Sequence, residues 1–270
     1  MLRITLHALA FLVLTLLTQI GGIAYLAMLL TARAPFPRRV PMRLVTFLLF
    51  YTGLSIATAF VAPALGRVPL SCLADRTDRL VVRSPLYCAL NRQYVTPRLR
   101  ALANALSEHM DRAFPGTVTV ALDANFPFID GFPLLPHLSH TDGRKLDFAF
   151  FYADDGGRFL NETTRSPIGY FAFEQPAAGD EQPCLGRNDW LTARWDFDFL
   201  QPLFPAYRLE AERTASAIRW LTTDGVDEFG LRKVFIEPHL KKTLGIDDDH
   251  VRFQGCRAAR HDDHFHVEIE

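Results

Sequence analysis

The sequence predicts an α+β fold with an antiparallel sheet, preceded by two apolar helices that form a transmembrane hairpin. Two long runs without Asp, Glu, Lys or Arg fall within the first 65 residues of the 270-residue chain. Residues 66–270 instead alternate between amphipathic stretches and short apolar stretches, without the repeating strand–helix unit of a parallel sheet. The length of this second part suits one domain with a sizeable core.

The first apolar run extends from Ile4 to Leu30 and the second from Leu44 to Leu65. About 20 apolar residues cross a bilayer as a helix, so each run is long enough. The apolar region of a cleaved signal peptide has only about 7–15 residues, and a buried core helix is the other alternative. Two such runs close together favour spans at about residues 4–30 and 44–65, with a connecting loop at 31–43.

The connecting loop predicts the orientation of this hairpin. It contains no acidic residue and four arginines, namely Arg33, Arg38, Arg39 and Arg43. Positively charged loops stay in the cytoplasm, so both ends of the hairpin are expected outside it. Residues 66–270 are then a periplasmic or extracellular domain tethered to a bacterial inner membrane.

The cysteines agree with an oxidising compartment. All four follow the second apolar run: Cys72, Cys88, Cys184 and Cys256. Four cysteines allow three pairings, of which we favour Cys72–Cys88 with Cys184–Cys256, and buried free thiols are the alternative. No C-x2-C pair is present, which argues against a zinc–thiolate site. The net charge of −1 gives no reason to expect nucleic acid as a partner.

The outer domain contains both kinds of secondary-structure signal and one long stretch rich in loop residues. Helices are predicted at 96–114, 209–222 and 238–244, and strands at 118–122, 146–152, 169–173, 233–236, 251–254 and 264–269. Residues 154–195 are predicted to be mostly loop because Gly, Pro, Asn and Asp cluster there.

Five of the nine histidines lie in two short segments. The second segment ends in a predicted strand, where side chains alternate between two faces. One face then carries His264, His266 and Glu268, whereas the other carries Phe265, Val267 and Ile269. Two imidazoles at positions i and i+2 can reach the same metal ion or the same water molecule.

The first segment contains His140 and Asp147. Asp147 falls near the start of an apolar strand, and His140 lies in the loop before it. Gly143 permits the turn that brings His140 back toward Asp147. If the two strands share one sheet, His140, Asp147 and His266 converge.

Two histidine nitrogens and one carboxylate oxygen are a typical ligand set for catalytic zinc. Three protein ligands leave the fourth position open to water. Zinc lowers the pKa of water to about 7 and polarises a carbonyl group. A nearby base must take the proton, and His264 has the right reach.

The motif H-x-S-H-x-x-G-x3-D, followed by H-D-x-H-F-H-V near the end of the sequence, resembles the penicillin-insensitive murein endopeptidases. These enzymes belong to the group named for lysostaphin, the D-alanyl-D-alanine metallopeptidases and sonic hedgehog. The segment from Val234 to Leu244 is also similar to the strand and helix that precede the last motif in that family. The resemblance covers about His137 to Val267 and implies a small antiparallel sheet flanked by helices.

The resemblance also implies roles for individual residues. His140, Asp147 and His266 are the expected zinc ligands, and His264 is expected to act on the water that zinc activates. Two further histidines are expected at the site, namely His261 as a second catalytic residue and His137 as part of the lining. Asp262 and Asp263 are expected either to orient His264 or His261 by hydrogen bonds, or to form a solvated turn.

The function expected from these residues is a zinc endopeptidase that hydrolyses cross-links between peptidoglycan stem peptides. One alternative is a D,D- or L,D-carboxypeptidase or dipeptidase, which a closed pocket with an arginine for the terminal carboxylate would favour. A second is a zinc-stabilised, non-catalytic wall-binding module, which His264 argues against, because a structural zinc site needs no base and usually has four protein ligands. A third is a metal-dependent hydrolase of another bond.

Overall fold

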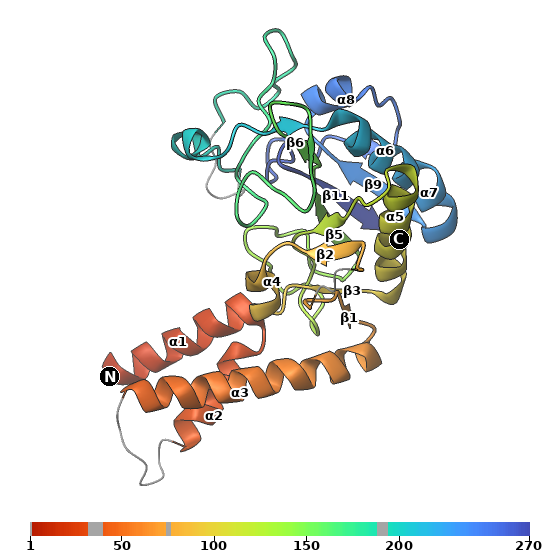
Figure 1. The fold of residues 1–270 in the computed structure, drawn as a ribbon. Coiled ribbons are helices and arrows are strands. Elements are labelled where there is room, and N and C mark those ends of the chain that lie inside the picture. The colour runs from red at the N-terminus through yellow and green to blue at the C-terminus, as the bar shows by residue number, and fades with distance from the viewer. Residues whose placement is uncertain (1, 32–39, 74–76, 188–193) are drawn as a thin grey trace.

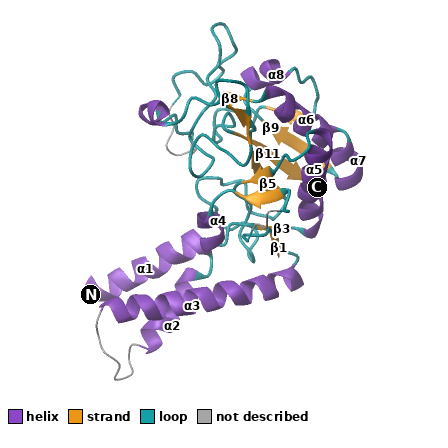
Figure 2. Ribbon diagram, in the orientation of Figure 1, coloured by secondary structure: helices purple, strands orange, loops and turns teal. Residues whose placement is uncertain are grey.

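The computed structural model describes residues 2–31, 40–73, 77–187 and 194–270. Within these ranges an N-terminal group of apolar helices precedes an α+β domain (Figures 1 and 2). Arg33, Arg38 and Arg39 lie outside the described residues, and with them most of the loop on which the predicted orientation depends.

The first apolar run forms two helices instead of the single predicted span. Helix α1 covers Leu2–Thr18 and α2 covers Gly21–Thr31. Between them Gln19 adopts a left-handed conformation, with φ of 66°. A Cβ atom at Gly22 would lie 2.0 Å from the hydroxyl oxygen of Thr15, so glycine allows the two helices to approach closely.

The second run is continuous. It forms α3, Val40–Val61, followed by the short 3-10 helix η1, Ala62–Leu65. Of the described residues, only Val40–Leu65 forms a helix that is both long and apolar enough to cross a membrane. The predicted two-helix hairpin is therefore not what the structure shows, because the first run bends at Gln19.

The domain is built on one six-stranded sheet. Its strand order is β10 (Val251–Arg252), β9 (Leu231–Phe235), β11 (His264–Ile269), β5 (Lys145–Ala149), β4 (Thr119–Ala121) and β2 (Leu80–Val82). The pairings from β9 to β4 are antiparallel, but both edge strands, β10 and β2, pair in parallel. The sheet is therefore mixed, and the antiparallel prediction holds for its centre.

Helices α5 (Pro97–Ala113) and α6 (Ala211–Thr222) cover one face of this sheet, whereas long loops lie on the other (Figure 1). The helix-covered face is apolar, and there Phe148 and Phe265 stack with ring centroids 5.4 Å apart. The predicted helix at 96–114 is confirmed, since the Thr96 hydroxyl accepts a hydrogen bond from the Leu99 amide at its start.

The other elements are short. Two small sheets are formed by β1 (Val68–Pro69) with β3 (Tyr94–Val95), and by β6 (Tyr152–Ala153) with β7 (Phe159–Leu160) and β8 (Arg208–Leu209). The remaining helices of the described residues are α4 (Pro85–Ala89), η3 (Asp198–Leu203), α7 (Asp224–Phe229) and α8 (Pro238–Leu244).

The strand predicted at 169–173 is wrong. Both Gly169 and Phe171 have positive φ angles, of 85° and 69°, so the segment cannot be extended. A Cβ atom at Gly169 would lie 2.4 Å from a methyl carbon of Leu122. Because the backbone approaches Leu122 so closely, the neighbouring side chain of Tyr170 is buried, and Tyr170 is 4% exposed.

The favoured disulfide pairing is confirmed. Cys72 is bonded to Cys88, and Cys184 is bonded to Cys256. The second bond closes a long stretch of chain and fixes the segment that leads into the His261–His266 motif. Among the described residues no free cysteine remains.

The buried face of α5 gives the first prediction. Leu102 is fully buried, and Leu102→Ala should lower the free energy of unfolding by about 2–5 kcal/mol, because it removes apolar contacts and leaves a cavity. Thermal and denaturant unfolding of the detergent-solubilised chain would measure this. Leu185→Ala, at a side chain that is 80% exposed, is the matched control and should change stability little. Equal stability of the two variants would contradict the assigned packing.

Candidate metal centre

Strand pairing brings the three predicted ligands together. In the β11–β5 register His266 lies opposite Asp147, and His140 reaches the same point from the loop before β5. The Asp147 Oδ1 atom lies 2.7 Å from His266 Nδ1 and 3.3 Å from His140 Nε2, and those two nitrogens are 3.0 Å apart. All three residues are at most 1% exposed.

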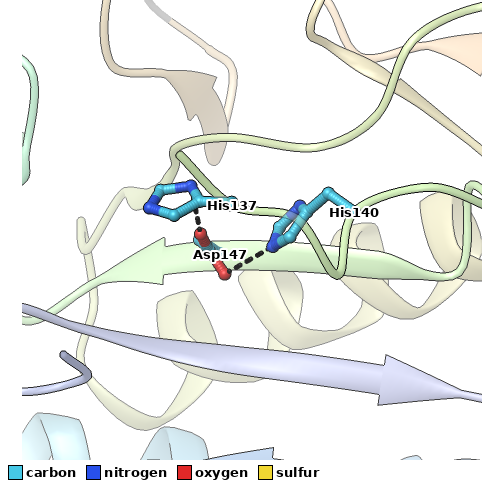
Figure 3. A group of neighbouring side chains, drawn as sticks. All are labelled: His137, His140 and Asp147. Atoms are coloured by element: carbon cyan, nitrogen blue, oxygen red, sulfur yellow. Dashed lines mark ion pairs between the residues drawn. The ribbon is translucent and has the colours of Figure 1, made fainter. Parts of the chain in front are cut away.

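His137 joins this cluster. Its Nδ1 atom lies 3.5 Å from Asp147 Oδ2, and potential ligand atoms of His137, His140 and Asp147 lie within 4.8 Å of one another. Figure 3 shows both imidazoles beside the Asp147 carboxylate, above strand β5. This buried group of two histidines and an aspartate can hold a metal ion.

The spacing of the donor atoms fits a small cation. Ligand atoms about 2.0–2.1 Å from a tetrahedral zinc ion lie about 3.3 Å apart. The distances among His140, Asp147 and His266, 2.7–3.3 Å, are close to that value and slightly shorter. These donors therefore converge on one point.

A hydrogen bond at Nδ1 sets the orientation of the His140 imidazole. Nδ1 lies 2.6 Å from the carbonyl oxygen of Ala124, to which it can only donate a hydrogen bond. Nε2 then carries the lone pair that faces Asp147, as metal-ligating histidines require. His266 lacks such support, because its Nε2 atom has no hydrogen-bond partner among the described residues.

The protonation states also suit a metal. Burial alone would raise the pKa of Asp147, but the surrounding histidines outweigh it and hold that pKa well below its ordinary value. Burial lowers the pKa of His266 to about 4, which keeps the imidazole neutral. A metal ion needs deprotonated ligands, and both residues provide them near neutral pH.

His264 lies beside this cluster on the same strand face as His266. Its Nδ1 atom is hydrogen-bonded to the Asp263 carboxylate, and its Nε2 atom lies 3.6 Å from Asp147 Oδ2. Burial would lower the pKa of His264, but Asp147 and Asp263 outweigh it and raise that pKa. The imidazole is thus oriented and prepared to accept a proton.

The two aspartates before His264 have different partners. Asp263 holds His264, whereas Asp262 forms an ion pair with Arg260. They are 3% and 1% exposed, so the alternative of a solvated turn does not hold. His261 is also buried, and its ring centroid lies 4.9 Å from that of His264.

Sequence reasoning missed two supports of the site. The first is Arg92, whose Nε donates to Asp123 Oδ1 at 2.7 Å, while Asp123 Oδ2 lies 3.1 Å from His137 Nδ1. The second is Tyr170, whose hydroxyl donates to Asp147 Oδ2 at 2.6 Å. Local sequence gave little signal for either, although Asp123 directly follows a predicted strand.

A cavity of about 510 Å³ opens onto the cluster. Its lining includes His140, Asp147 and His266, together with His261 and the exposed Arg257. The convergent donor residues therefore lie at the wall of a space large enough for a small ligand. No protein-family model matches the sequence, and no curated protein matches it either.

The Tyr170 hydroxyl gives the second prediction. Tyr170→Phe removes a hydrogen bond that holds the Asp147 carboxylate, so the affinity for a metal ion, probed with Zn²⁺, should fall by about 10–100-fold. Competition with a chromophoric chelator on the full-length protein would measure the dissociation constant. Tyr207→Phe, at a tyrosine outside the cluster, should leave the affinity unchanged. Equal affinities in the two variants would show that Tyr170 does not orient the ligand.

Proposed function

We propose that this chain is a membrane-anchored zinc metallopeptidase that hydrolyses cross-links between peptidoglycan stem peptides. The observation that carries the proposal is the convergence of His140 Nε2, Asp147 Oδ1 and His266 Nδ1 within 3.3 Å, beside an oriented His264. The motif spacing that resembles murein endopeptidases supports the choice of substrate.

His140, Asp147 and His266 would hold the zinc ion. When bound, zinc would polarise the scissile carbonyl and lower the pKa of water. His264 would accept the proton of the attacking water at Nε2, because its Nδ1 is engaged by Asp263. The same imidazole would then return that proton to the leaving amine.

The proposed location is the outer side of a bacterial cytoplasmic membrane. Two disulfides are typical of proteins in oxidising compartments, and α3 with η1 is long and apolar enough to anchor the domain. Tethering would confine hydrolysis to the wall nearest the membrane.

A D,D- or L,D-carboxypeptidase is the second candidate, and Arg257 is the observation that favours it. Arg257 lines the same cavity as the donor cluster and is exposed. An arginine there can bind the terminal carboxylate of a free stem peptide. A non-catalytic wall-binding module is less well supported, since such a module would need neither His264 nor the hydrogen bond from Asp263.

The third prediction tests the reaction itself. The full-length protein in detergent should convert cross-linked muropeptide dimers into monomers, chelator should abolish the conversion, and added zinc should restore it. His264→Ala should bind zinc but lose at least about 100-fold in rate, because the base is missing. Mass spectrometry of the muropeptides would follow the products.

His250→Ala is the matched control, because His250 contacts Asp248 and lies outside the cluster. Intact dimers with shortened stems would favour the carboxypeptidase instead. Unchanged dimers and stems, despite one bound zinc per chain, would refute the cell-wall peptidase.

The fourth prediction separates the two peptidase candidates. If stem ends are trimmed, Arg257→Gln should lower kcat/KM for that trimming about tenfold or more, because a charge-assisted hydrogen bond to the carboxylate is lost. Arg232→Gln, at an exposed arginine on β9, is the control. Rates with free pentapeptide stems would be compared. Equal rates in both variants would remove Arg257 from substrate recognition.

A further inference from the structure

The loop at 122–144, between β4 and β5, carries both His137 and His140. It contains no helix or strand, so its shape depends on hydrogen bonds within the loop and on contacts made from outside. Two of those contacts come from Gln19, between helices α1 and α2, and from Arg67, two residues after η1. The membrane-associated part of the chain and the metal centre are therefore physically connected.

The first contact is made by Gln19, at the bend between α1 and α2. Its side-chain Oε1 atom accepts a hydrogen bond of 2.8 Å from the backbone amide of Phe128. Gln19 is 5% exposed and has a left-handed backbone, so the bend places a polar side chain against the loop. A buried amide that loses its acceptor destabilises the conformation that contains it.

The second contact is made by Arg67, which follows η1 after Gly66. Arg67 is 6% exposed, and its guanidinium group forms an ion pair with Asp130 and lies against Gly143. A Cβ atom at Gly143 would lie 2.5 Å from three guanidinium atoms, so no other residue fits there without a shift. Arg67 thereby touches the loop both before His137 and after His140.

A third connection runs from the middle of α3. The Asn91 side-chain amide donates to Tyr51 Oη at 2.9 Å and to Ser55 Oγ at 3.3 Å. The next residue, Arg92, holds Asp123, which in turn contacts His137. This route reaches the same loop at Asp123.

We propose that Gln19 and Arg67 are positioning residues of the metal centre, and that the apolar helices are part of its framework. Neither residue touches a donor atom. They hold the loop at 122–144 in the shape that directs His137 and His140 toward Asp147. A loop without these contacts would have to be ordered when the metal binds, which lowers affinity. The inference rests on the metal binding of the proposed function.

The test uses the full-length protein in detergent micelles and its dissociation constant for zinc. Gln19→Met keeps the side-chain length but removes the acceptor, and Arg67→Met removes the guanidinium group. Each should weaken zinc binding about tenfold, the lower end of the effect of removing an orienting partner. Gln19→Glu retains an acceptor oxygen for Phe128 and should restore most of the affinity.

Thr46→Val is the matched control within the helices, because the Thr46 hydroxyl donates to the Met42 carbonyl oxygen of its own helix. Hydrogen exchange of the zinc-free variants supplies a readout independent of the metal. Amides in 122–144 should exchange faster in Gln19→Met and Arg67→Met, while those of β11 keep their protection. The absorption bands of bound Co²⁺ should also shift, because the histidine geometry changes.

The outcomes are distinguishable. The inference would be overturned if both methionine variants bind zinc with wild-type affinity and show unchanged hydrogen exchange in the loop. Loss of protection throughout β5 and β11 would overturn it too, since the residues would then support the whole fold. If the unsubstituted chain does not bind zinc, the proposed function is refuted. Hydrogen exchange of the amides in 122–144 would then still show whether Gln19 and Arg67 hold the loop.

Discussion

The buried carboxylate of Asp147 is the constraint on which the rest of the structure depends. It is 0% exposed in the centre of the sheet, where an uncompensated charge is very unfavourable. One oxygen faces His140 and His266, and the other faces the Tyr170 hydroxyl. The β5–β11 register, the loop before β5 and the irregular segment around Tyr170 all serve to place these partners. Stability and chemistry therefore depend on the same contacts.

One face of the sheet packs in the apolar core, and the other carries the polar cluster. Phe148 and Phe265 stack in the helix-covered core, while their neighbours Asp147, His264 and His266 point to the opposite face. Side chains alternate strictly between the two faces of a strand. Close packing of the phenylalanines on one face therefore also fixes the positions of the polar side chains on the other. Protein sites built on strands of this kind hold their geometry better than sites built on loops alone.

Much of this arrangement follows from the sequence. The bounds of β11 and the start of α5 were predictable because they depend on local periodicity and capping, and the meeting of His140, Asp147 and His266 was expected on the condition that their two strands share one sheet. Both disulfides were also anticipated, although pattern alone allowed other pairings. The bounds of β11 and the start of α5 are determined largely by nearby residues, whereas the β5–β11 pairing and the Cys184–Cys256 bond join residues far apart in the chain.

Other features depend on contacts between distant residues, and the sequence could not reveal them. Gln19 and Phe171 have left-handed backbones that are unfavourable for non-glycine residues, yet each is held by a partner far along the chain, Phe128 and Asp263 respectively. The ion pair between Arg92 and Asp123 is likewise non-local. The parallel pairing of the two edge strands also leaves no local signature.

The alternation of His264, Phe265 and His266 has a consequence for how the chain tolerates change. Insertion or deletion of one residue within β11 would exchange its two faces. The imidazoles would then enter the apolar core and Phe265 would enter the polar cluster, so folding and chemistry would fail together. Substitutions can accumulate in this strand one at a time, but its length in residues is effectively fixed.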